Sequence, residues 1–171
     1  EALAGTTSIA SSTVASNAPG AGGAGAQPGA PGAGGGVAGT LTLVNSLLAS
    51  NGDSGCTGSI SDGGHNLDFP SSGCPGIVAD PQLGALADNG GPTRTHALGA
   101  ESAARDGVPA SGAQCEPTDQ RGQTRPKGTA CDIGAFEAEP VAPTGGGGVI
   151  TSVGAKTRVG SRLPCTARSP T

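Results

Sequence analysis

The chain has no methionine, tyrosine or tryptophan and contains only two phenylalanines. Globular cores usually take much of their buried area from aromatic side chains. A core in this chain must therefore be built from Leu, Ile, Val and Ala, which suits thin, repetitive stacking. Glycine (33 residues) and proline (14 residues) are abundant instead. Because both are costly in helix interiors, we expect no long helices.

Basic residues are absent from positions 1–93, which carry six acids. Residues 94–139 carry five basic and seven acidic residues, and residues 140–171 carry four basic and no acidic ones, which gives the net charge of −4. Nucleic-acid binding is not expected, since it needs a basic patch supported by aromatics or by a known motif. No apolar run approaches the roughly 18 residues of a membrane helix, so we also expect no membrane span.

Five cysteines in a chain with so few large apolar residues indicate an oxidising compartment. Four of them, Cys56, Cys74, Cys115 and Cys131, allow three connectivities. We predict the two nearest-neighbour bridges, each of which closes a loop of about 15–20 residues and contributes about 3 kcal/mol in the loop-entropy model. Cys165 is left over.

An internal repeat organises the first third of the chain. The segment GTTSIASSTVASN (Gly5–Asn17) aligns without a gap with GTLTLVNSLLASN (Gly39–Asn51), at an offset of 34 residues. A period between about 20 and 50 residues is typical of solenoids, and alternating small polar and apolar residues predict strands. Both units end in Asn, which tolerates the left-handed conformation of a sharp corner. Stacked coils would place Asn17 above Asn51, about 4.8 Å apart.

Three regions follow from these patterns. Residues 1–76 are predicted to form coils, with an Ala/Pro/Gly loop at 18–36. Residues 77–138 contain the short apolar pieces GIVA, LGALA, THAL and DIGAF between turn residues, which predicts short strands. Residues 139–171 are predicted to be a linker and a disordered basic tail, most simply solvated. Because the chain starts at Glu1 without a methionine, we expect a processed product or part of a longer protein.

Three blocks in the second half carry a family resemblance. They are GHNLD (Gly64–Asp68), ADPQLGALADNGGPTRTHAL (Ala79–Leu98) and TDQRGQTRPKGTACDIGAFE (Thr118–Glu137). In this order they resemble the C-terminal region of bacterial choice-of-anchor Q proteins, which are similar to the polymorphic outer-membrane protein and pectate-lyase-like β-helices. The likeness covers roughly residues 37–137. The chain departs from it at SAARD (Ser102–Asp106), where the family has an apolar SPAID-like segment.

The resemblance implies an all-β fold, a right-handed parallel β-helix fragment with a C-terminal disulfide-closed cap and a disordered tail. It also implies a secreted or cell-surface bacterial protein of structural, adhesion type, non-catalytic and monomeric, that presents an extended face to glycans or other cell-surface components. The alternative is a polysaccharide lyase or hydrolase on the same fold, because one fold hosts many functions.

The block that ends at Glu137 has three possible interpretations. Zinc needs closely spaced ligand pairs, whereas Cys115 and Cys131 are 16 residues apart and the chain has only two histidines. Lyase chemistry would pair Asp119 or Asp132 with Arg121 beside a bound calcium. Calcium needs several oxygen ligands at once, and no dense acid cluster is present. We therefore expect no cofactor, with only a weak possibility of calcium at Asp53, Asp62 and Asp68.

We favour the third interpretation, a structural cap. The open end of a β-helix exposes strand edges, which natural proteins cover, and terminal units of stacked folds are atypical for this reason. Arg121 would pair with Asp119, Asp132 or Glu137 as a local clamp, an ion pair worth about 0–1 kcal/mol if exposed. His65 and His96 are expected to be hydrogen-bonded corner residues rather than bases. The predicted cap residues are Asp119, Arg121, Asp132, Ile133, Phe136 and Glu137.

Overall fold

The computed structural model describes residues 7–24, 32, 35–52 and 55–142. Contacts divide the chain into a unit at 1–141 and a second unit at 142–171, and the first unit is the subject below. The basic tail, Cys165, Asp53 and much of the 18–36 loop lie outside the described residues. The described residues are all-β, and none of them forms a helix long and apolar enough to cross a membrane.

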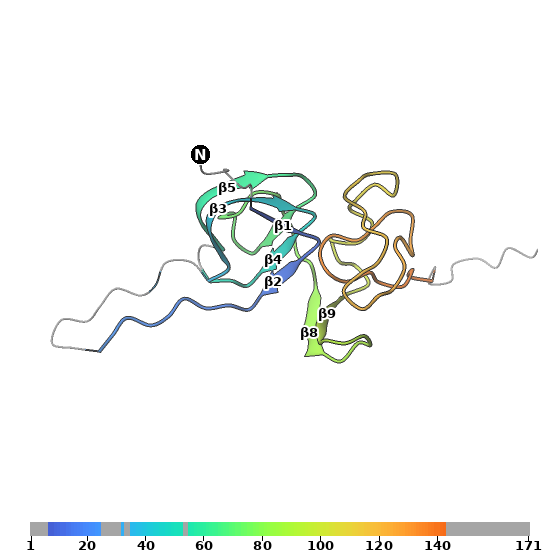
Figure 1. Cartoon of the computed structure of the whole chain (residues 1–171). Helices are drawn as coiled ribbons and strands as arrows, with labels where there is room; N and C mark the ends of the chain where they lie inside the picture. The colour runs from blue at the N-terminus through green and yellow to red at the C-terminus, as the bar shows by residue number, and fades with distance from the viewer. Residues whose placement is uncertain (1–6, 25–31, 33–34, 53–54, 143–171) are drawn as a thin grey trace, which may run out of the picture. The chain divides into compact units, whose positions relative to one another are not determined.

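Two parallel sheets stack the repeat units (Figure 1). Sheet A has the order β1–β3–β5, made by Ser8–Ala10, Val37–Val44 and Cys56–Asp62. Sheet B has the order β2–β4–β6–β7, made by Thr13–Ala15, Leu47–Ala49, Leu67–Phe69 and Ile77–Val78. The chain alternates between the two sheets from β1 to β6, so successive strands of one sheet belong to successive repeat units.

The strand register confirms the repeat alignment. Ile9 lies opposite Leu43 in sheet A and Val14 opposite Leu48 in sheet B, and both pairs differ by 34 positions. The next unit is shorter, because Leu43 lies opposite Asp62, a difference of 62 − 43 = 19. The longer first spacing contains the Ala/Pro/Gly stretch at 18–36, which the strands tolerate as an insertion between coils.

The central strand β4 of sheet B is buried on both faces. Toward sheet A, Leu48 packs with Leu43 and Val37 in one hydrophobic cluster. On the other face, Leu47 and Ala49 pack in a second cluster, with residues from the segment 79–133. This explains why three consecutive residues of β4, rather than alternate ones, are inaccessible to solvent. The region after β7 therefore covers a sheet face.

The region from 79 to 138 is not a further parallel coil. β8 (Leu83–Ala87) and β9 (Thr95–Leu98) form an antiparallel hairpin, and the described residues after β9 form turns and isolated bridges. The predicted strand at DIGAF is wrong. Its amides bond to the coils instead, since the N–H of Gly134 donates to the carbonyl oxygen of Asn45 (3.1 Å) and the N–H of Ala135 to Oγ1 of Thr13 (3.1 Å).

Both predicted disulfides are present. Cys56, at the start of β5, is bonded to Cys74, and Cys115 is bonded to Cys131. The first bridge belongs to the cluster between the sheets, and the second belongs to the cluster outside sheet B. Each hydrophobic cluster therefore has its own covalent link.

The predicted Asn ladder is present, but the corner chemistry differs. Oδ1 of Asn51 accepts hydrogen bonds from the backbone N–H (3.2 Å) and Nδ2 (3.0 Å) of Asn17. The left-handed residues are the preceding serines, Ser16 (φ 59°) and Ser50 (φ 54°). Asn51 makes side-chain bonds along the stack, such as that from its Nδ2 to the carbonyl oxygen of Val14 (2.7 Å).

Two stacked glycines in sheet A give a stability prediction. Gly39 lies opposite Gly58, and both have positive φ values, 127° and 103°. A Cβ atom on Gly58 would collide with the backbone of Gly39, whereas one on Gly39 would meet nothing within 4 Å. We expect Gly58→Ala to lower the free energy of unfolding by about 1–3 kcal/mol more than Gly39→Ala, because only Gly58→Ala adds overpacking to the φ strain. Urea unfolding of both variants measures the difference, and equal losses would contradict this packing.

Candidate functional site: a buried ionic cluster

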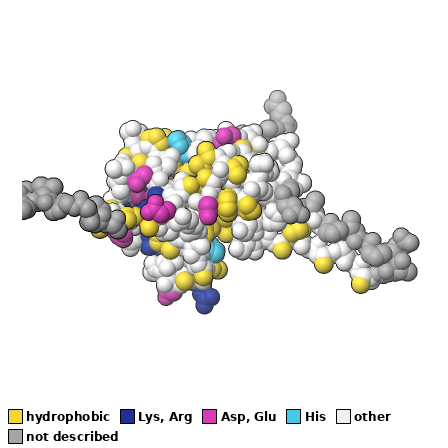
Figure 2. Space-filling model, turned by 180° about the vertical axis from the view of Figure 1, so that it is seen from behind, with side chains coloured by type: hydrophobic (Ala, Val, Ile, Leu, Met, Phe, Trp, Pro, Cys, Tyr) yellow, Lys and Arg dark blue, Asp and Glu magenta, His cyan; other side chains and the backbone are white. Residues whose placement is uncertain are grey.

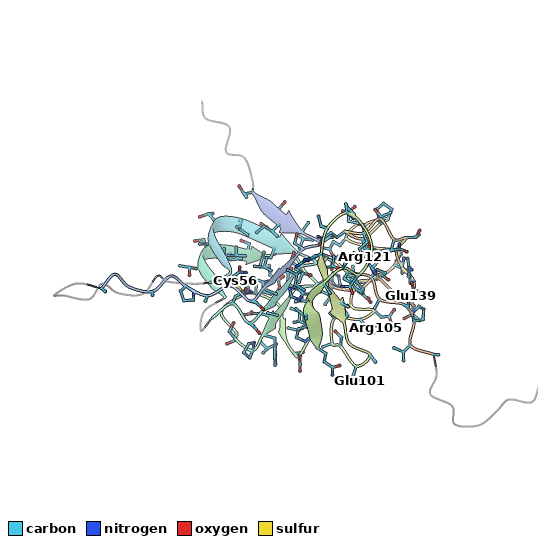
Figure 3. The ribbon with its side chains drawn as sticks, turned by 90° about the horizontal axis from the view of Figure 1, so that it is seen from below. Cys56, Glu101, Arg105, Arg121 and Glu139 are labelled. Carbon is cyan, nitrogen blue, oxygen red and sulfur yellow. A yellow bond between two sulfur atoms is a disulfide. The ribbon has the colours of Figure 1, made fainter. Side chains whose placement is uncertain are left out.

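Five charged side chains gather in the turn-rich segment after β9. We call this group the ionic cluster, and Figure 3 labels one member, Arg121, in the half of the ribbon that is made of turns. Charged side chains are almost never fully buried unless they are paired. Here the side chains of Asp119 and Glu137 are 0% exposed, that of Arg125 is 1% exposed and that of Arg121 is 11% exposed. The members are Asp119, Arg121, Arg125, Asp132 and Glu137.

Asp119 organises the first half of the cluster. Its carboxylate accepts hydrogen bonds from the backbone N–H groups of Arg121 (2.8 Å), Gln123 (3.0 Å) and Glu137 (3.0 Å). The guanidinium of Arg121 also donates to Oδ2 of Asp119, from Nε (2.9 Å) and Nη2 (2.7 Å). Asp119 thus closes its own turn and ties it to the chain 18 residues later.

Arg121 connects the cluster to its surroundings. Its Nη2 donates to the carbonyl oxygen of Glu137 (2.6 Å), and its Nη1 donates to that of Asn89 (3.3 Å). The guanidinium carbon lies 3.6 Å from the ring centroid of Phe136. Such cation–π contacts contribute about 0.5–2 kcal/mol, the larger values applying to desolvated pairs. The predicted pairing of Arg121 with Asp119 is present, and it is mostly buried rather than exposed.

Arg125 and Glu137 form the second half. Arg125 donates from Nη1 to the carbonyl oxygen of Asp132 (3.2 Å) and from Nη2 to that of Gly134 (2.6 Å). Its Nε lies 3.5 Å from Oε2 of Glu137, which is an ion pair without hydrogen-bond geometry. The Glu137 carboxylate accepts from the backbone N–H groups of Lys127 (2.9 Å) and Asp132 (3.0 Å).

Asp132 binds two backbone segments. Its Oδ1 accepts from the N–H of Asp106 (2.8 Å) and its Oδ2 from the N–H of Ala138 (2.7 Å). Asp106 in turn accepts from the N–H of Ala130 (2.8 Å). Each of these acids therefore accepts hydrogen bonds from backbone N–H groups that have no partner in a β-sheet. This is how a segment with no regular structure satisfies its buried backbone.

The pKa values reflect this environment. Burial raises the pKa of Asp119, but hydrogen bonds from the N–H of Glu137 and from Arg121 outweigh it, so the pKa lies below its ordinary value. Burial raises the pKa of Asp132 and of Glu137 above their ordinary values, although backbone hydrogen bonds oppose it. Burial lowers the pKa of Arg125, against the attraction of Glu137, Asp119 and Asp132.

These directions predict a pH-dependent effect of Asp119→Asn. A depressed folded-state pKa contributes stability that is complete above the unfolded-state pKa and is lost as the pH falls through the folded-state pKa. We expect Asp119→Asn to cost about 1–3 kcal/mol at neutral pH, since it weakens charge-assisted hydrogen bonds. The cost should shrink in acid, where wild-type Asp119 also becomes neutral. Urea unfolding of both proteins at a series of pH values measures it.

Asp88→Asn is the matched control for this measurement. Asp88 makes the same local bond to the N–H two residues ahead, that of Gly90 (3.0 Å), but it is exposed. We expect its cost to be small. A cost of Asp119→Asn that does not change between neutral and acidic pH would contradict the depressed pKa.

The other predicted residues lie apart from the cluster. Nδ1 of His65 is bonded to the carbonyl oxygen of Gly107 (3.0 Å), and Nδ1 of His96 to that of Gly84 (2.8 Å). Asp62 accepts from the N–H of Gly64 (2.8 Å). Within the described ranges, no three His, Cys, Asp or Glu side chains are placed to hold a metal ion.

The segment that carries the ionic cluster packs against the side of the coils. Ile133 packs with Leu47 and Leu67 on the outer face of sheet B, and Phe136 is buried nearby. At the end of sheet B, Ile77 and Val78 of β7 are each 53% exposed. That the block Thr118–Glu137 also closes the end of a longer stack of coils stays a prediction. Its contacts in the described residues attach it to a sheet face.

Sequence reasoning missed Arg125 and Asp106. The four acids and three bases between residues 115 and 137 indicated ion pairing, but they did not indicate which base is buried. Comparison with known proteins adds no partner for this arrangement: no family model, no curated protein and no solved structure matches the chain.

Proposed function

We propose that the chain is a non-catalytic, structural part of a secreted or cell-surface bacterial protein. In this proposal it is a right-handed parallel β-helix of the choice-of-anchor Q type, and it presents an extended face to glycans or neighbouring surfaces. One observation carries the non-catalytic part: the acids of the ionic cluster point inward and accept backbone N–H groups. A general acid or base must instead reach a substrate.

Two observations support the rest. The parallel registers of sheets A and B repeat with the same first offset, as expected for coils of a solenoid. The two disulfides are compatible with an extracellular protein, because disulfides persist in oxidising compartments. The family name rests on the resemblance of the blocks between Gly64 and Glu137.

The alternative, a polysaccharide lyase or hydrolase, needs acids and bases that face a groove. Among the described residues, one groove of about 610 Å³ is lined by Glu101, Asp106 and Lys127 among others, and Figure 2 shows several Asp and Glu side chains on the face that it draws. The direct test is incubation with polygalacturonate and calcium while ultraviolet absorbance is recorded. We expect no unsaturated product. Its appearance in wild type would end the non-catalytic proposal.

A groove beside sheet B is the place where a glycan chain fits best. It has a volume of about 760 Å³ and lies between the corners of β2 and β4 and the β8–β9 hairpin, with Leu86 (53% exposed) on its wall. Ligand sites are typically concave, with a few polar groups. We expect binding on a panel of bacterial and plant surface glycans, weakened by Leu86→Lys and kept by Ser111→Lys, an exposed control position. An empty panel would favour a spacer without a ligand.

A further inference from the structure

A short sequence motif recurs at the strands of sheet A, with part of its first copy outside the described residues, and has no role in the function proposed above. Each unit contains Gly, a hydroxyl residue, any residue and a second hydroxyl residue: GTTS at 5–8, GTLT at 39–42 and GSIS at 58–61. In a strand, the two hydroxyl residues of this motif point to the same face because side chains alternate. The intervening Leu41 and Ile60 point the other way and pack against the inner cluster.

The register places these hydroxyls in rows. Ser8, Thr42 and Ser61 stand opposite one another, and Thr40 stands opposite Ser59. The pairing of β3 with β5 runs through seven residue pairs without a bulge. Neighbouring hydroxyls within a row, which crosses the strands, are thus about 4.8 Å apart, and the two rows are about 6.6 Å apart along the strands. We call this set, with Thr57, the hydroxyl array.

The hydroxyl array is free to bind an outside partner. Its members are exposed apart from the half-buried Thr42, and within the described part of the chain none of their hydroxyls has a hydrogen-bond partner. The sequence from 7 to 52 contains no charged residue. The one acid of β5, Asp62, accepts hydrogen bonds from the N–H of Gly64 and from Asn66. The face is therefore polar, uncharged and periodic in two directions.

The array is also held rigidly. Thr40 and Thr42 are β-branched, which restricts their χ1 angles. Beneath them, Leu43 is completely buried, and β5 begins at the Cys56–Cys74 disulfide. Positions fixed in this way keep the spacing of the backbone. The backbone thus holds the hydroxyl residues on a regular grid.

These features select the kind of partner. A hydroxyl exchanges its bond with water for one with a ligand at little net gain, so a small soluble molecule would bind this face weakly. The main cavities among the described residues are lined by residues outside the hydroxyl array. The outer face of sheet A has no aromatic ring or charge that could orient a sugar. A solid lattice engages all the hydroxyls at once. Each hydroxyl both donates and accepts, as does every water molecule in ice. We propose that the outer face of sheet A binds the surface of ice.

The test is inhibition of ice recrystallisation by the whole chain, followed as grain growth under a microscope. The double variant Thr40→Lys/Ser59→Lys places two hydrated charges on the face, and we expect the concentration for half-maximal inhibition to rise about tenfold or more, which corresponds to about 1.4 kcal/mol. Ser111→Lys, exposed on another segment, is the matched control and should behave as wild type. Circular dichroism and unfolding midpoints confirm that each variant is folded.

The milder variant Thr40→Ala/Ser59→Ala covers the case in which the lysines unfold the protein, and it should also weaken inhibition. Grain growth unaffected by wild type, or inhibited equally by wild type and both double variants, overturns the proposal. Binding to crystalline cellulose or chitin that is lost in the same variants, without an effect on ice, overturns it too and assigns the face to a polysaccharide. The glycan panel above tests the groove beside sheet B independently.

Discussion

Arg125→Met is expected to lower the free energy of unfolding by about 3–5 kcal/mol, the typical loss when one partner of a buried ion pair is removed. The methionine matches the length of the arginine stem but leaves Glu137, which is 0% exposed, without its cation. It also removes the donors to the carbonyl oxygens of Asp132 and Gly134. Domains are stable by only about 5–15 kcal/mol, so the variant is expected to be close to unfolding.

Two further variants make this result interpretable. Arg94→Met removes an exposed arginine and should change stability by less than about 0.5 kcal/mol. Arg125→Met/Glu137→Gln removes the unpaired charge as well, and we expect it to regain part of the loss. Urea unfolding at neutral pH gives all three values. If Arg125→Met costs no more than Arg94→Met, the cluster is not buried as described.

Cys115→Ala/Cys131→Ala is expected to lower the free energy of unfolding by about 3 kcal/mol, because the bridge closes a loop of 16 residues in the unfolded chain. This bridge fastens the ionic cluster, since Cys131 precedes Asp132 and is completely buried in the outer cluster. We expect the loss to appear in the urea midpoint, with circular dichroism as the signal.

Cys56→Ala/Cys74→Ala provides the comparison, with a loop of 18 residues and therefore a similar loss. The two bridges lie in different clusters, so the losses should add in the quadruple variant. Reducing agent should destabilise wild type and leave the quadruple variant unchanged. Stability of wild type that is indifferent to reduction would argue against both bridges.

The parallel stacking was predictable because the repeat encodes it. An ungapped match between Gly5–Asn17 and Gly39–Asn51 fixes which residues can lie opposite one another, and the register follows it at Ile9 and Leu43. The disulfides followed from spacing for a similar local reason. The left-handed serines were missed, because residue preference pointed to Asn17 and Asn51, which are engaged in bonds along the stack.

The site was predictable in part. Asp119 and Arg121 are two residues apart, so their pairing is a local property of the turn. The burial of Arg125 depends on carbonyl groups seven and nine residues away in a segment without periodicity, and no pattern in the sequence reveals it. The antiparallel β8–β9 hairpin and the covering of sheet B are likewise tertiary outcomes, decided by which apolar face is available for packing.

Native-state hydrogen exchange, measured amide by amide, tests whether the acids of the ionic cluster serve as buried acceptors for the backbone. We predict that the N–H groups of Asp132, Glu137 and Ala138, which donate to Glu137, Asp119 and Asp132, exchange as slowly as the amides of β3. If these N–H groups instead exchange at the rate of an open loop while β3 stays protected, the acids are exposed to solvent and are not buried acceptors.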